Sequence, residues 1–183
     1  ALSTCGAADT PLDAGCQKWA ELLNQTGLFD VTVYNNSQLG NVVDVLDRLI
    51  DGDVIAEAVS ASDIADPLNI PDLKATMAPF LFDSIDDINT LTQSDWFAAL
   101  ADQAASQGVK IVAANLINGE RYFITKKPVA EPADMKGMKI RVPNNTNYIN
   151  TFTAFGCAPT PMAATEIYTS LQTSVVDGME HPL

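Results

Sequence analysis

The sequence is poor in the residues and motifs that most enzymes use for chemistry. It has one histidine, His181, close to its last residue, so Ser/His/Asp or Cys/His catalysis would depend on that position. It contains neither GxGxxG nor GxxxxGK[ST], the glycine-rich patterns that hold nucleotide phosphates. The adjacent acids Asp86 and Asp87 fall in a predicted exposed helix and are typical of solubilising charge. These features argue against catalysis.

Cysteine is scarce as well. No pair among the three cysteines has the CxxC or Cys/His spacing of a metal site, and we predict no metal and no cofactor. Cys5 and Cys16 are close in sequence. Either a disulfide or two free thiols fits them, because sequence closeness does not establish the Cα separation that a bridge requires. Cys157 is predicted to be a small buried hydrophobic residue.

Long apolar runs are also missing. No segment approaches the roughly 20 apolar residues that span a bilayer, so we expect a soluble protein that is not embedded in a membrane. The 47% of hydrophobic residues can nevertheless build a core in a chain of 183 residues. The first residues, ALSTCGAADTP, lack a basic region followed by an apolar stretch, so a signal peptide is either absent or already removed.

Positive charge is sparse and unevenly placed. The net charge of −13 argues against nucleic acid or an anionic membrane as a partner. Residues 1–120 hold 4 basic and 18 acidic residues, a net of −14, whereas residues 121–183 hold 6 and 5, a net of +1. All six of those basic residues lie between Arg121 and Arg141. This stretch could hold a small anion, or its four lysines could form a solvated face.

Segments in which apolar residues recur with the spacing of a helix alternate with segments in which they recur with the spacing of a strand. This alternation favours parallel strands joined by crossover helices. Thr10-Pro11-Leu12-Asp13 predicts a helix start. Predicted helices cover residues 10–27, 42–49, 85–92, 95–106, 146–155 and 163–172, the last with Ile167, Tyr168 and Leu171 inward. Predicted strands cover residues 29–34, 54–59, 77–84 (a buried strand or crossing segment), 109–114, 121–125, 139–142 and 175–176. We predict two α/β lobes, residues 1–120 and 121–183, with a cleft between them.

Arg141 stands between Ile140 and Val142 in the predicted strand 139–142. These two β-branched neighbours predict one buried face, with the arginine on the other. Pro143 ends the strand and a helix N-terminus follows, so a guanidinium and a positive dipole end converge, a combination that suits a carboxylate. The alternative is an internal salt bridge, for instance to Glu166 or Glu180.

Two long blocks, GERYFITKKPVAEPADMKGMKIRVPNN and FGCAPTPMAATEIYTSLQTSVVDGMEHPL, resemble the substrate-binding proteins of tripartite ATP-independent periplasmic (TRAP) transporters. The resemblance continues upstream through QLG at residues 38–40, DG at residues 51–52 and APFLF at residues 78–82, and it covers essentially the whole chain. It implies a two-lobed periplasmic-binding-protein-like α/β fold with mainly parallel sheets and a ligand cleft. It also implies a periplasmic receptor, not an enzyme, that captures an organic acid and delivers it to TRAP membrane subunits.

The resemblance also implies roles for individual residues. Arg141 would pair with the substrate carboxylate, and Arg121 would assist it. His181 takes a position that is asparagine in sialic-acid-binding members, which departs from the sialic acid pattern. Ser60 lies where those members present an acid, so the small polar residues around it suggest a smaller or less hydroxylated ligand. Further candidates for contact with the ligand are Tyr148, Asn144, Phe80 and Phe155, the last two of which also fit aromatic core packing.

Members of this family are longer than this chain and carry a C-terminal portion that returns to the first lobe. We therefore expect a fragment whose second lobe is incomplete. The alternative function is that of a small α/β enzyme acting on a carboxylate substrate. For such an enzyme the general bases on offer near Arg141 would be Glu166, Glu180 and His181.

Overall fold

The computed structural model describes residues 1–182, and the chain divides into two compact units, Ala1–Ile117 and Asn118–Leu183. The lobe boundary expected from the charge balance lies between residues 120 and 121. Within residues 1–182, no helix is both long enough and apolar enough to cross a membrane.

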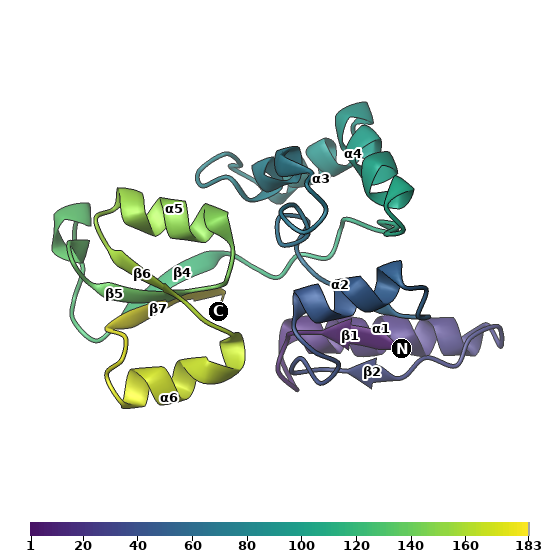
Figure 1. Ribbon diagram of the computed structural model, residues 1–183, viewed down its shortest axis with the longest axis horizontal. Coiled ribbons are helices and arrows are strands. Elements are labelled where there is room, and N and C mark those ends of the chain that lie inside the picture. The colour runs from purple at the N-terminus through teal and green to yellow at the C-terminus, as the bar shows by residue number, and fades with distance from the viewer. Residues whose placement is uncertain (183) are drawn as a thin grey trace. The chain divides into compact units, whose positions relative to one another are not determined.

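The first unit contains a three-stranded parallel sheet of order β2-β1-β3. Figure 1 labels β1 and β2 of this sheet. Its strands are short and comprise β1 (Leu2–Thr4), β2 (Val33–Tyr34) and β3 (Ala56–Ala58). Its helices are α1 (Pro11–Gln25), α2 (Val42–Ile50), the 3₁₀ helix η1 (Pro71–Met77), α3 (Ile85–Thr92) and α4 (Asp95–Ser106).

Helix α1 begins as its sequence predicts and covers one face of this sheet. The Thr10 hydroxyl accepts a hydrogen bond from the Asp13 amide at 3.3 Å, and Pro11 fills the first helical position, where its missing N–H costs nothing. Cys16 of α1 packs with Leu2 of β1 and Ala58 of β3 in one hydrophobic cluster. Cys5 is exposed and Cys16 is buried, and no disulfide joins them.

Two predictions for the first unit are wrong. Residues 77–84 form neither a strand nor a buried crossing: after η1 the chain runs as a loop, and the Phe80 side chain is 90% exposed. Residues 109–114 form no strand either, although their apolar pattern suits one. A strand exists only where a neighbour exchanges hydrogen bonds with it, and no strand within residues 1–182 pairs with this segment.

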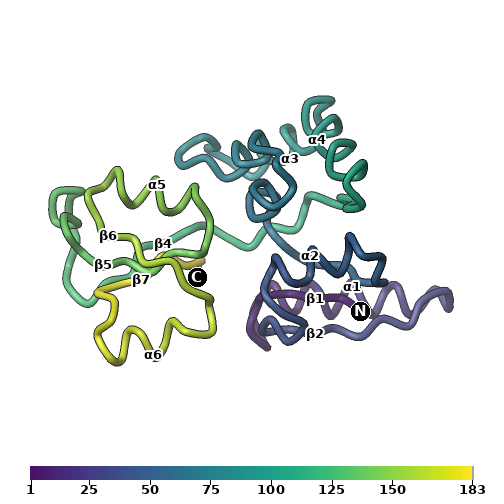
Figure 2. The backbone as a smooth tube through the Cα atoms, in the orientation of Figure 1, coloured from purple at the N-terminus to yellow at the C-terminus, as the bar shows by residue number. Residues whose placement is uncertain are grey.

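The second unit contains a four-stranded sheet of order β4-β7-β5-β6. β5 pairs in parallel with β6 and β7, whereas β4 pairs antiparallel with β7. The strands are β4 (Arg121–Thr125), β5 (Lys139–Val142), β6 (Ala158–Pro161) and β7 (Gly178–Pro182), and the helices are η2 (Pro132–Met135), α5 (Thr146–Ala154), η3 (Ala164–Glu166) and α6 (Ile167–Gln172). The two α-helices lie on opposite faces of the sheet (Figures 1 and 2). The predicted α/β class with mainly parallel sheets is confirmed.

The core of the second unit lies between the sheet and α5. Ile140 and Val142 of β5 are fully buried there with Phe152, and Phe155 packs against them partly buried. Cys157 joins this cluster, as predicted. Tyr168, which we expected to point inward, is 75% exposed on α6.

The last strand begins at Gly178 and not at residues 175–176, where we predicted it. A Cβ at Gly178 would lie 2.5 Å from the Ile124 carbonyl oxygen on β4. Only glycine permits this close approach, so Gly178 allows β7 to enter the sheet between β4 and β5.

Candidate functional site

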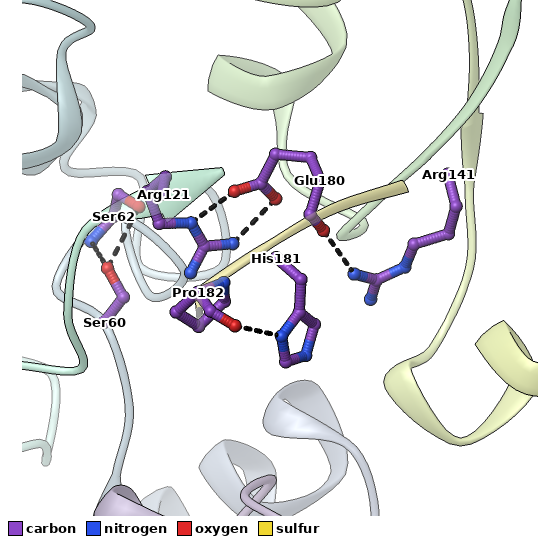
Figure 3. A network of polar contacts seen from close by, with 7 residues as sticks. All are labelled: Ser60, Ser62, Arg121, Arg141, Glu180, His181 and Pro182. Carbon is purple, nitrogen blue, oxygen red and sulfur yellow. Dashed lines mark hydrogen bonds and ion pairs between the residues drawn. The ribbon is translucent and has the colours of Figure 1, made fainter. Parts of the chain in front are cut away.

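Arg141 is held inside the second unit by main-chain carbonyl groups. Its side chain is 3% exposed. Nη2 and Nε donate to the Met162 carbonyl oxygen at 2.9 and 3.1 Å, and Nη1 donates to the Glu180 main-chain carbonyl at 3.3 Å (Figure 3). Carbonyl oxygens accept hydrogen bonds but carry no formal charge, so these contacts orient the guanidinium without altering its charge.

The Met162 carbonyl is itself positioned by the sheet. The Met162 amide donates to the Val142 carbonyl at 3.1 Å, which continues the pairing of β5 and β6 by one residue. The acceptor for Arg141 is therefore placed by backbone pairing and not by a mobile side chain. The orientation of Arg141 follows from the topology of the sheet.

Arg121 forms the internal salt bridge that the sequence left open for Arg141. It lies on β4, and its Nε and Nη2 donate to the two carboxylate oxygens of Glu180 on β7, with 2.7 Å between Nη2 and Oε2. The Glu180 side chain is 5% exposed and that of Arg121 is 30% exposed. The Tyr148 ring lies 5.0 Å from the guanidinium carbon of Arg121, a cation–π contact.

Strand register separates the two arginines. Residues opposite one another in neighbouring strands share a sheet face, and successive residues alternate. Because Arg141 lies opposite Met179, it shares a face with His181, two residues further along β7. Arg121 lies opposite Pro182 and shares the other face with Glu180. Figure 3 shows Arg121 and Glu180 on one side of β7 and His181 on the other.

His181 has a defined tautomer. Its Nδ1 lies 2.6 Å from the Pro182 carbonyl oxygen. A carbonyl can only accept, so Nδ1 carries a hydrogen, and in the neutral ring Nε2 is the acceptor. The ring can therefore offer a ligand an acceptor when it is neutral and a donor when it is protonated.

The turn after β5 contains a buried asparagine, Asn145, which was not among the predicted site residues. Asn145 is 4% exposed and caps α5, with its side-chain oxygen accepting from the Asn147 amide at 2.9 Å. Asn144, the predicted ligand contact, is exposed. The sequence signal for Asn145 was present, since asparagine directly before a helix is a preferred cap.

Ser60 belongs to the first unit and follows the carboxyl end of β3. Its hydroxyl oxygen lies 3.2 Å from that of Ser62 and accepts from the Ser62 amide at 3.3 Å. The ends of neighbouring parallel strands gather polar groups at one sheet edge, which is where ligands bind in such sheets.

Comparison with known proteins gives the family. Residues 2–183 match the family described as bacterial extracellular solute-binding protein, family 7, or DctP. The chain belongs to this family. The resemblance to TRAP substrate-binding proteins is thereby confirmed. The family consists of transport solute-binding proteins and not of enzymes.

Named relatives agree with this assignment. The C4-dicarboxylate-binding periplasmic protein DctP of Rhodobacter capsulatus is 32% identical over 178 residues, which are 96% of this chain and 53% of that protein. The sialic acid-binding periplasmic protein SiaP of Vibrio cholerae is 31% identical over 157 residues, 86% of this chain and 48% of that protein. The chain thus spans about half the length of these curated relatives.

Solved structures show the same fold. A TRAP periplasmic solute-binding protein from Desulfovibrio salexigens, in complex with diglycerolphosphate, matches with a TM-score of 0.92 and 34% identity, over 99% of this chain and 58% of that one. A second, from Ochrobacterium anthropi with bound L-fuconate, has a TM-score of 0.91 and 33% identity, over 99% of this chain and 62% of that one. Those two-lobed proteins confirm the predicted fold class.

Proposed function

We propose that this chain carries the anion-binding part of a periplasmic receptor, which captures a small organic acid and presents it to the membrane subunits of a TRAP transporter. The observation that carries the proposal is the placement of Arg141. Main-chain carbonyls of Met162 and Glu180 fix its buried guanidinium in one orientation. A planar fork held in advance loses little entropy when it binds a carboxylate through two hydrogen bonds.

The other predicted residues take supporting roles in this proposal. His181 shares the Arg141 face of the sheet and offers Nε2 as a second polar contact. Arg121 engages Glu180 through two of its nitrogens, so its main contribution is to keep β4 and β7 in register and to add positive potential. Tyr148 contacts the guanidinium of Arg121 and so belongs to that face of the sheet, whereas Asn144 is exposed in the turn before α5. Ser60 stays a candidate contact of the first unit.

The relatives support a carboxylate as the ligand class. The names of two of them specify C4-dicarboxylate and sialic acid, and one solved neighbour holds L-fuconate. Another solved neighbour holds diglycerolphosphate, so phosphate esters are the alternative ligand class with which carboxylates have to be compared. We propose the carboxylate because the arginine fork matches its two coplanar oxygens.

Delivery to the transporter is proposed to depend on closure of the two lobes. A ligand that contacts both lobes only in the closed form shifts the population toward that form by its differential affinity. The closed form would then be the one that the membrane subunits recognise.

A thermal-shift screen of the full-length protein tests the ligand class. The panel contains monocarboxylates, C4-dicarboxylates, aromatic acids and sugar acids, with phosphate monoesters as the contrast. A ligand at 100 times its dissociation constant should add roughly 2.7 kcal/mol to the free energy of unfolding. The proposal expects shifts with carboxylates and recovery of the ligand unchanged. Shifts with phosphate esters alone would overturn the carboxylate, and consumption of the ligand would favour an enzyme.

A further inference from the structure

The Ser3 hydroxyl in the middle of β1 is buried without a partner. The residue is 0% exposed, and its oxygen has no hydrogen-bond partner within residues 1–182. A buried hydroxyl that makes no hydrogen bond costs about 1–3 kcal/mol, so it is rare in folded proteins and needs an explanation.

The neighbours of Ser3 in the sheet supply one. Ser3 lies opposite Glu57 of β3 on one side and opposite Tyr34 of β2 on the other. All three side chains share the sheet face opposite the one that Leu2 and Ala58 present to α1. Neighbouring strands are about 4.8 Å apart, so Glu57 is the nearest residue on this face of β3 that carries a group able to donate a hydrogen bond to Ser3.

The surroundings of Glu57 disfavour its negative charge. Ser3 and Tyr34 face it from the neighbouring strands with neutral hydroxyls, and the charged group that acts on it is Asp63, from the turn after β3. Burial first, and the nearby Asp63 second, raise the pKa of Glu57 to about 7. A carboxyl that keeps its proton is also a hydrogen-bond donor, which an ionised carboxylate is not.

We propose that Glu57 is a proton-binding site of the first unit, at which the neutral carboxyl keeps its proton and donates a hydrogen bond to the Ser3 hydroxyl oxygen. Loss of the proton leaves Ser3 without this donor and sets a second negative charge beside Asp63. The turn between Glu57 and Asp63 carries Ser60, so the same proton supports the position of Ser60. This last consequence rests on the proposed function, whereas the proton site itself does not.

The sign of the effect on stability follows from linkage. The ordinary pKa of the carboxyl is 4.5, and its value in the folded protein is about 7. Between these values the folded protein holds a proton that the unfolded chain has released, so folding is favoured at the acidic end. The contribution of Glu57 is therefore complete below pH 4.5 and is lost as the pH rises through about 7.

Thermal unfolding of the full-length protein without ligand, at several values between pH 5 and 8, tests the site. The Glu57→Gln variant keeps the shape and a donor but cannot ionise, so its Tm should fall less than that of the wild type across this range, by about 2 °C or more. The matched control Asp102→Asn removes an exposed acid of α4 and should follow the wild-type profile. A Glu57→Gln profile parallel to the wild type would overturn the proposal.

A direct titration keeps the proposal testable if a variant fails to fold. The ¹³C chemical shift of the Glu57 carboxyl in the wild-type protein should change with a midpoint near 7, and a midpoint near the ordinary 4.5 would overturn the proposal. In Ser3→Ala the neutral form loses its acceptor, so the midpoint should move to lower pH. An unchanged midpoint would show that Ser3 is not the partner. Neither readout contains ligand, so neither depends on the proposed transport function.

Discussion

The two units place an acidic side chain within a sheet in opposite ways. Glu180 of β7, with a side chain 5% exposed, meets the fork of Arg121. Glu57 of β3 meets two hydroxyl-bearing neighbours and a second acid, Asp63. Removing a carboxylate from water costs several kcal/mol, which either a counter-charge or a bound proton offsets. The second unit uses the counter-charge, and we infer that the first uses the proton.

This difference follows the distribution of charge along the sequence. Residues 1–120 hold 4 basic residues against 18 acidic ones, whereas the six basic residues of the remainder lie between Arg121 and Arg141. Those two arginines then take separate tasks on opposite faces of one sheet. Arg121 neutralises an acid of the protein, and Arg141 is held by main-chain carbonyls and is the arginine that we propose to orient an anion.

The largest expected effect comes from removing the counter-charge in the second unit. Arg121→Ala leaves Glu180 buried without its fork and should lower the free energy of unfolding by about 3 kcal/mol, a value reduced somewhat by the partial exposure of Arg121. Urea denaturation of the full-length protein measures it. The double variant Arg121→Ala/Glu180→Gln should recover part of the loss, and a loss below about 1 kcal/mol in the single variant would contradict this account.

A smaller effect of opposite sign is expected in the first unit. At pH 8 Glu57→Gln should raise the free energy of unfolding by about 1–2 kcal/mol, because it removes a charge that burial and Asp63 disfavour, with allowance for partial exposure. At pH 5 the same variant should be close to neutral, since the wild-type carboxyl then carries its proton. Urea denaturation at pH 5 and at pH 8 measures the two effects. Equal effects at the two pH values would show that the charge of Glu57 does not destabilise the first unit.

The smallest effect is expected for an exposed ion pair of the first unit. Arg48 and Asp53 have a nitrogen–oxygen distance of 2.8 Å, and their side chains are 45% and 51% exposed. Arg48→Ala should therefore cost less than about 1 kcal/mol. Urea denaturation of Arg48→Ala and Arg121→Ala under the same conditions compares an exposed ion pair with a largely buried one. Equal losses of stability in the two variants would show that burial does not determine the effect.

Local signals in the sequence were enough to predict the ends of elements that are marked by a capping residue or a proline. Thr10 and Pro11 mark the start of α1, and Pro143 follows the end of β5, so these bounds could be read directly. Residues 109–114 and 77–84 could not be assigned correctly from their apolar pattern. The pattern reports a preference, whereas a strand also needs a pairing partner and a burying surface, which are set by distant parts of the chain.

The sequence singled out candidate residues but not their pairings. Charge clustering and strand context led to Arg141, with Glu180 as an alternative internal partner, and the family resemblance added Arg121. Which arginine takes the Glu180 carboxylate is decided by the register of β4 against β7, segments that lie far apart in the sequence. The neighbourhood of Ser3 and Glu57 depends in the same way on the register of β1 against β3, for which the sequence holds no local signal.

The central claim is that Arg141 anchors a carboxylate, and isothermal titration of the full-length protein tests it most directly. The titrant is the acid that gives the largest shift in the thermal screen. Arg141→Ala should weaken binding by at least about 100-fold, and Arg141→Lys should also bind poorly because the fork is lost. Lys136→Ala, an exposed cation of the same basic stretch, should stay within about 2-fold of wild type. Near wild-type affinity in a folded Arg141→Ala variant would contradict the claim.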